Sequence, residues 1–320
     1  MPAATIPANE TDSLPVISLA GAPEGFAAPL GESLRRYGFA LVAGHGIDAA
    51  LITESWRLTE EFFALPEMEK LRYHEQGAAG ARGYTPFGRE IAKGAAHHDL
   101  KEFWHVGRDL PAGHPLLSPS MPPNIWPERP AGFENTFARL FAAFDAAGAH
   151  VLAGIALDLG LPEDWFVPAI ADSNSVLRLL HYPPINDARN GAIRAEAHED
   201  INLITLLLGA EEAGLELLTR QGEWLPLAPP PGTMVVNIGD MLQRLTNHVL
   251  PSTTHRVRNP DSMRAGISRY AMPFFLHPHS DFRLETLPGC ITPGNPNRNA
   301  QAITADAYLQ ERLREIGLKT

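Results

Sequence analysis

The feature of this sequence that most constrains its fold is a change in the pattern of apolar and turn-forming residues near residue 175. From Ser175 onward, short runs of β-branched and aliphatic residues alternate with turn signals such as Gln221-Gly222 and Asn259-Pro260. Many short strands at this spacing are typical of a sandwich, a barrel or a jelly roll. The expected strands cover residues 176–182, 201–208, 215–218, 223–227, 233–238 and 267–275.

The half of the chain before this point is predicted to be mainly helical. Its clearest helix runs from about residue 131 to 159, because Phe137, Phe144, Val151 and Ile155 mark one continuous apolar face. Short strands are expected at residues 14–19 and 39–43, and a helix is expected from Ile52 to Pro66. The fold class is therefore α+β with a mainly β core, a helical first half and a helical tail.

A long loop is expected at residues 76–98, which are rich in Gly and Ala and poor in apolar anchors. Long loops within compact domains are usually functional or mobile. We expect this loop to cover the functional site.

Composition excludes several classes of function. Acidic residues outnumber basic ones by 37 to 26, which gives a net charge of −11 and argues against a nucleic-acid surface. Cys290 is the only cysteine, so neither an internal disulfide nor a thiolate metal cluster is expected. The start, MPAATIPANETDSLPV, lacks the features of a signal peptide, and no apolar run long enough to span a bilayer is expected. The sequence therefore predicts a soluble, cytoplasmic protein without nucleic-acid or membrane partners.

The candidate chemistry lies in His198-Glu199-Asp200 and in His255. In a strand, residues i and i+2 point to one face, so His198 and Asp200 are expected to project together while Glu199 faces away. His255 follows Asp200 by 55 positions, far enough for intervening strands to return it across a β core. Two histidines and one carboxylate are typical of a mononuclear Fe(II) oxygenase site, which leaves coordination positions open.

Pairs of this kind also arise by accident in a chain with 13 histidines. His-x-Asp alone is common by chance. The clusters His97-His98-Asp99 and His277-Pro278-His279 are interpreted as solvated segments, since the first falls in the expected loop and a proline interrupts the second.

The sequence around these residues resembles the isopenicillin N synthase-like family of non-haem Fe(II)- and 2-oxoglutarate-dependent oxygenases. The matching motifs in the second half are HEDINLITLL from His198, VVNIGDMLQRLTNH from Val235, STTHRV ending at Val257, and Arg269-Tyr270-Ala271 leading into MPFFLHP. Those in the first half are LPVISLA, YGFALVAGHGI, FFALPEMEK, RGYTPFGRE, DLKEFWHVG and NIWP. The resemblance covers nearly the whole chain in the same order.

This resemblance implies a double-stranded β-helix, or jelly roll, flanked by helices. It implies that His198, Asp200 and His255 bind Fe(II), and that Arg269 and Tyr182 hold the distal carboxylate of 2-oxoglutarate. The implied reaction consumes O₂ and 2-oxoglutarate, releases succinate and CO₂, and hydroxylates, desaturates or cyclises a small organic molecule. Residues 1–130 would form the family's N-terminal region and residues 131–320 the catalytic core, packed as one unit.

The chain departs from the family pattern at three positions. Glu199 stands where many relatives carry Thr, and Leu180 stands where several carry Asn. Ala271 replaces the serine of an Arg-x-Ser pair, so one hydroxyl donor to 2-oxoglutarate is missing.

The sequence leaves two alternatives to this enzyme open. One is an iron oxidase of the same fold that does not use 2-oxoglutarate, and the other is a non-catalytic small-molecule-binding protein. The expected pocket walls are residues 82–93 and 101–106 and the segment after Phe275, which favours a small, partly apolar and anionic substrate. The sequence names neither the substrate nor the oligomeric state.

Overall fold

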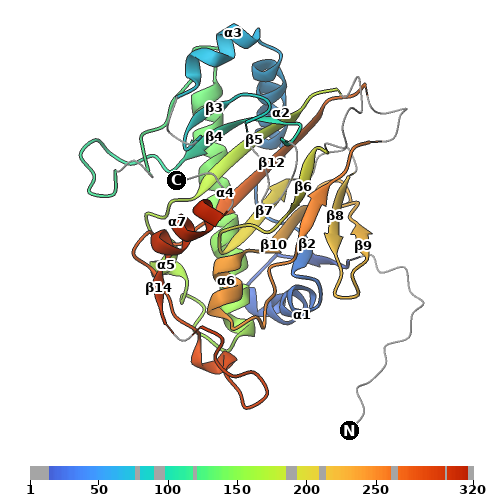
Figure 1. Ribbon diagram of the computed structural model, residues 1–320, viewed down its shortest axis with the longest axis vertical. Coiled ribbons are helices and arrows are strands. Elements are labelled where there is room, and N and C mark those ends of the chain that lie inside the picture. The colour runs from blue at the N-terminus through green and yellow to red at the C-terminus, as the bar shows by residue number, and fades with distance from the viewer. Residues whose placement is uncertain are drawn as a thin grey trace.

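The computed structural model describes residues 14–75, 80–89, 98–117, 121–184, 193–208, 214–260, 266–299 and 301–315. Two β-sheets form the centre of the molecule (Figure 1). The larger has eight strands in the order β1-β2-β10-β7-β12-β5-β4-β3, and the smaller has four in the order β6-β11-β8-β9. The expected jelly-roll core is confirmed.

The bounds of the strands show how the two sheets are assembled from distant parts of the chain. In the large sheet they are β1 Val16–Ser18, β2 Phe39–Ala43, β10 Met234–Ile238, β7 Ile204–Leu208, β12 Arg269–Leu276, β5 Val176–Tyr182, β4 Glu102–Gly107 and β3 Gly83–Thr85. In the small sheet they are β6 Ala195–His198, β11 His255–Val257, β8 Leu215–Leu218 and β9 Trp224–Pro226. Strands β13 (Arg283–Leu284) and β14 (Ile303–Thr304) form a separate pair. All pairings in the two main sheets are antiparallel except the one between β1 and β2.

Seven α-helices lie within the described residues, and the longest of them packs against the large sheet. They are α1 Ala27–Tyr37, α2 Ala49–Phe63, α3 Glu67–Lys70, α4 Phe133–Asp158, α5 Val167–Ile170, α6 Asp240–Leu245 and α7 Ala305–Glu315. Helix α4 runs nearly the length of the molecule (Figure 1), and both α1 and α2 contact it. The long helix expected at residues 131–159 is confirmed to within two residues at its start and one at its end.

Helix α4 corrects one expectation from composition. By length and composition alone it could cross a membrane, although no such segment was expected. Its apolar residues are instead buried within the protein: Phe137, Leu140, Phe144 and Val151 are 0% exposed. They belong to the cluster that also contains Leu206 and Phe274 of the sheet, so α4 is a core helix.

Alternation along the strands gives the large sheet two different faces. In β12, Met272, Phe274 and Leu276 belong to the cluster around α4. Residues of the opposite parity, Arg269 and Ala271 among them, line a cavity on the other face. Because successive side chains of a strand point to opposite faces, a single strand contributes to both the packed core and the cavity.

Strands β1 and β2 confirm the short strands expected at residues 14–19 and 39–43, whereas β3 and β4 were not predicted. Strand β3 lies within residues 76–98, which were expected to form one long loop, and it pairs with β4 so that Tyr84 lies opposite Trp104. This pairing depends on partners distant in sequence, and a three-residue strand gives too little periodicity to be recognised alone. Residues 76–79 and 90–97 lie outside the described residues, so the cover stays a prediction.

The large sheet also joins the two regions that were expected to divide at residue 130. Strands β1 to β4 come from the first region, yet β2 pairs with β10 and β4 pairs with β5. Gly38 makes one of these connections possible, since it ends α1 in the left-handed conformation (φ 69°) immediately before β2. The division at residue 130 stays a prediction, and the sheet shows that backbone pairing crosses it.

Phe274 offers a test of the packing between the large sheet and α4. Its ring stacks on Phe144 with centroids 5.3 Å apart and is fully buried. We expect Phe274→Ala to lower the free energy of unfolding by about 3–5 kcal/mol, because the cavity it leaves cannot collapse completely. The measurement is urea unfolding, with Phe87→Ala as the matched control, since Phe87 is 49% exposed. Equal effects of the two substitutions would contradict this description of the core.

Candidate metal centre

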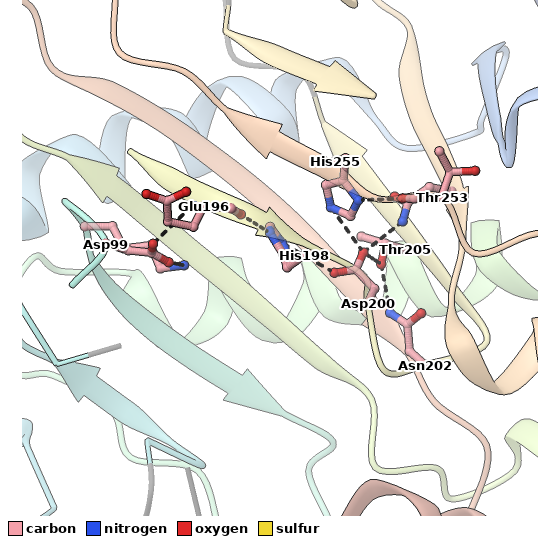
Figure 2. A network of polar contacts seen from close by, with 10 residues as sticks. Asp99, Glu196, His198, Asp200, Asn202, Thr205, Thr253 and His255 are labelled. Atoms are coloured by element: carbon pink, nitrogen blue, oxygen red, sulfur yellow. Dashed lines mark hydrogen bonds and ion pairs between the residues drawn. The ribbon is translucent and has the colours of Figure 1, made fainter. Parts of the chain in front are cut away.

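The three predicted ligand residues converge at one point between the two sheets. One possible ligand atom each from His198, Asp200 and His255 lies within 4.8 Å of the others. His198 Nε2 is 3.9 Å from Asp200 Oδ1, and His255 Nε2 is 3.9 Å from Asp200 Oδ2. Figure 2 shows the three side chains pointing toward one another. The spacing exceeds the expected value of about 3 Å, so the donors must draw closer together around an ion bound at about 2.0–2.2 Å.

Asp200 does not lie on the strand that carries His198, which corrects the prediction that both project from one strand. Strand β6 ends at His198, and Asp200 lies in the turn that follows. The pairing of β6 with β11 also shifts register between His255 and Val257. Within the described residues, Asp200 is held by a backbone hydrogen bond and not by pairing with a neighbouring strand: Asp240 N donates to Asp200 O at 2.8 Å.

Side chains from two strands hold the Asp200 carboxylate. Thr205 Oγ1 of β7 and Asn237 Nδ2 of β10 donate to Oδ2 at 2.5 and 2.8 Å. Asn202 Nδ2 donates in turn to Thr205 Oγ1 at 2.8 Å. These bonds restrain Oδ2 and leave Oδ1 directed toward His198, which suits a carboxylate that binds a metal through one oxygen.

Backbone carbonyls orient the two histidines. His198 Nδ1 lies 2.7 Å from Glu196 O, and His255 Nδ1 lies 3.1 Å from Thr253 O (Figure 2). An Nδ1–H that donates to these carbonyls leaves Nε2 with a lone pair, the form that binds metals. Phe39 packs edge-on against the His255 ring with centroids 5.5 Å apart.

The electrostatics favour the protonation states that a metal site needs. Burial lowers the pKa of His198 to about 4, and interaction with His255 acts in the same direction. Burial alone would raise the pKa of the Asp200 carboxyl, but His255, His198 and the hydrogen bonds from Thr205 and Asn237 together hold it below its ordinary value. At neutral pH the site therefore presents a neutral His198 and an ionised Asp200.

A cavity of about 70 Å³ adjoins the three residues. Arg269 and Tyr182, the predicted 2-oxoglutarate residues, both line it and lie opposite one another on β12 and β5. The Arg269 guanidinium carbon is 5.1 Å from the centroid of the Tyr182 ring, and Arg269 is only 4% exposed. Ala271 lines the same wall and lies opposite Leu180. Two of the three positions that depart from the family pattern are therefore paired between β12 and β5.

The donor set fits the group that the resemblance implies. Two imidazole nitrogens and one carboxylate oxygen, with space on the cavity side, match the ligands and open positions of a mononuclear Fe(II) site. A buried guanidinium and a phenol on the same cavity match the distal carboxylate of 2-oxoglutarate.

Several predicted pocket residues lie elsewhere. Tyr84 and Trp104 belong to the core around α4, whereas Lys101 and Phe275 do line the cavity. Arg178 of β5 also lines it but was not predicted, although its alternation with Tyr182 along one strand could have identified it.

Two clusters interpreted as solvated are partly buried. Asp99 is 4% exposed and pairs with Lys101, and burial lowers the pKa of His277 to about 4. His98 is exposed, as expected, while His97 lies outside the described residues.

The fold and the site together define a metal-dependent jelly-roll enzyme, and the comparisons with known proteins name its family. Residues 14–129 match the N-terminal region of the non-haem dioxygenase in morphine synthesis, and residues 173–278 match the 2OG-Fe(II) oxygenase superfamily. The chain belongs to this family of Fe(II)- and 2-oxoglutarate-dependent oxygenases. It is a 2-oxoglutarate-dependent dioxygenase that uses Fe(II) and O₂.

Relatives with full-length similarity include both curated proteins and solved structures. The proline hydroxylase BuaE of Petromyces alliaceus is 33% identical over 307 residues, which cover 92% of this chain and 94% of that protein. The crystal structure of a 2OG-Fe(II) oxygenase family protein from Caulobacter crescentus is 52% identical, with a TM-score of 0.87 and coverage of 95% of this chain and 99% of that one. A full-length Neurospora crassa protein, crystallised in complex with alpha-KG and thymine, is 27% identical, with a TM-score of 0.82 and coverage of 94% and 96%.

Asp200→Ala tests the role of the carboxylate. We expect it to abolish metal binding and turnover, because it removes the anionic donor from the convergent set while the fold survives. The measurements are Mn(II) titration, succinate formation and thermal unfolding. A variant with near-normal metal affinity or succinate formation would contradict the assignment.

Proposed function

We propose that His198, Asp200 and His255 bind the Fe(II), and that Arg269 and Tyr182 hold the distal carboxylate of 2-oxoglutarate. The observation that carries this proposal is the convergence of the three donors at a cavity that a buried arginine also lines. The enzyme oxidises a small organic molecule with release of succinate and CO₂.

Each group of this chain has a separate task in the proposed reaction. When bound, iron and 2-oxoglutarate supply the O₂-dependent oxidation of a substrate C–H bond. Asp200 provides the negative charge of the metal site, and Arg269 fixes the far end of the cosubstrate through a charge-assisted contact. Leu207, Leu215 and Pro273 give the cavity an apolar wall, which disfavours water beside the reacting groups.

The charges on the cavity wall favour an anionic substrate. Among the described residues that line it, the cationic side chains are Lys101, Arg178 and Arg269, and the acidic one is Asp200. Once Asp200 serves the metal and Arg269 serves 2-oxoglutarate, the remaining charged side chains on the wall are positive.

The two remaining cations are held firmly in place. The Arg178 guanidinium carbon lies 4.2 Å from the centroid of the Phe103 ring, and Arg178 Nε donates to His105 Nε2 at 2.6 Å. Lys101 Nζ lies 2.8 Å from Asp99 Oδ2, a buried ion pair that offsets its charge, so Arg178 contributes the larger positive charge to the cavity wall. A carboxylate on the substrate would complement this wall, and the substrate in the name of BuaE, proline, carries one.

Two further parts of the proposal concern the localisation and the partners of the protein. We place the protein in the cytoplasm, on the support of its lone, buried Cys290. Its net charge of −11 supports a small-molecule substrate in place of nucleic acid, and the burial of α4 in the core supports the absence of a membrane partner.

The retained Arg269 supports 2-oxoglutarate over an oxidase that does not use it, and Ala271 predicts weakened binding. We expect Ala271→Ser to tighten 2-oxoglutarate binding by about ten- to a hundred-fold, since a hydrogen bond to a charged group contributes about 1.5–3 kcal/mol. Arg269→Ala should nearly eliminate binding. Anaerobic calorimetry with Mn(II) in place of Fe(II) measures both. Unchanged binding in Arg269→Ala would mean that the cosubstrate lies elsewhere.

A substrate screen read out by succinate release tests the proposed function. Small carboxylic acids are compared with their matched amides, and we expect the acids to stimulate succinate release above the uncoupled background more strongly. Arg178→Leu should reduce this preference without weakening 2-oxoglutarate binding. A preference for amides, or none at all, would refute the anionic substrate.

A further inference from the structure

The candidate ligands lie where the pairing between β6 and β11 ends. His198 pairs with His255, and these residues are the last of β6 and the first of β11. One position further on, Glu199 and Thr254 lie outside both strands. The backbone of Thr254 binds elsewhere, because Leu218 N donates to Thr254 O at 2.8 Å.

A side-chain hydrogen bond joins the two segments at this position. Thr254 Oγ1 donates to Glu199 Oε1 at 2.9 Å. Glu199 lies between His198 and Asp200, and Thr254 directly precedes His255. One bond therefore connects the segment with two candidate ligands to the segment with the third. Because its acceptor is a carboxylate, it is stronger than a bond between neutral groups.

Glu199 itself is not part of the convergent donor set. The described residues that could hold an ion are His198, Asp200 and His255, and the Glu199 carboxylate is directed to Thr254 instead. The task of Glu199 is thus separate from that of the ligands on either side of it.

A second acid, Asp240, interacts with Glu199. Asp240 is 3% exposed, and burial together with Glu199 raises the pKa of its carboxyl while Arg312 opposes the rise. Arg312 Nε of α7 lies 3.2 Å from Asp240 Oδ2. Asp240 N also donates to Asp200 O, so backbone and side chains hold this turn together.

We propose that Glu199 is a positioning residue for the metal site. Its hydrogen bond with Thr254 sets the separation of the His198–Asp200 turn from His255 where strand pairing has ended, and thereby sets the metal affinity. The inference rests on the proposed metal ligands. The physical reason is that donors must approach to about 3 Å around an ion whose bonds are about 2.0–2.2 Å long. The present 3.9 Å spacings leave little tolerance for further separation.

Four substitutions separate the hydrogen bond from the charge. Thr254→Val removes the donor and leaves every charge in place, while Thr254→Ser keeps the hydroxyl. Glu199→Ala removes the acceptor, and Glu199→Gln keeps an acceptor oxygen without the charge. Co(II) affinity is measured by titration without 2-oxoglutarate, and the absorption spectrum of the Co(II) form reports the ligand geometry.

We expect Thr254→Val and Glu199→Ala each to weaken Co(II) binding by about 10- to 100-fold, the usual effect of losing a group that orients a metal ligand. Thr254→Ser should bind like the parent chain, and Glu199→Gln should lie closer to the parent than Glu199→Ala. The double variant Glu199→Ala/Thr254→Val should bind no more weakly than either single one, because both lose the same bond.

Parent-like affinity and spectrum in Thr254→Val would overturn the proposal, as would additive losses in the double variant. If Glu199→Ala fails to fold, Thr254→Val decides alone, since valine closely matches the shape of threonine. Asp200→Ala distinguishes this failure from that of the proposed function. If it too binds Co(II) normally, the ligand assignment is wrong, whereas its loss beside an unaffected Thr254→Val refutes the positioning role alone.

Discussion

The structure depends on one constraint, the alternation of side chains along the strands of the large sheet. A strand of this sheet has the helical core on one face and the cavity on the other. Its odd-numbered and even-numbered residues point to opposite faces, so each set must suit the face that it meets. In β12 the even-numbered Met272, Phe274 and Leu276 meet the helices, while Arg269 and Ala271 face the cavity. Strand β5 repeats this pattern, with Leu177 and Leu179 in the helical core and Tyr182 on the cavity. The helices therefore support, from the opposite face, the strands that carry the cavity residues.

The fold class and the candidate ligands could be predicted because they depend on local signals and short motifs. The long apolar face of α4 and the run from Val176 to Tyr182 carry enough periodicity to identify a helix and a strand. The motif around His198 is similarly informative. Each of these signals lies within one continuous stretch of chain.

The errors have a common cause, since they concern features created by distant partners. Strand β3 exists because β4 pairs with it, and Asp200 leaves the strand because the turn after His198 binds Asp240. Arg178 reaches the cavity through the fold of β5, and Asp99 is buried through its pair with Lys101. No pattern in the neighbouring residues reports such contacts.

The pairing of β2 with β10 has a consequence for how the chain is made. Phe39 lies opposite Asn237, about 200 residues later in the sequence, and Asn237 holds the Asp200 carboxylate. Contacts of such high sequence separation form late and lower the folding rate, because the entropy cost of closing a large loop precedes the stabilisation that they provide. Because the ribosome adds residues from the N-terminus onward, β2 cannot pair with β10 until most of the polypeptide has been synthesised. The sheet that supports the metal site is thus among the last parts of the nascent protein to be completed, and a prematurely terminated chain would lack it.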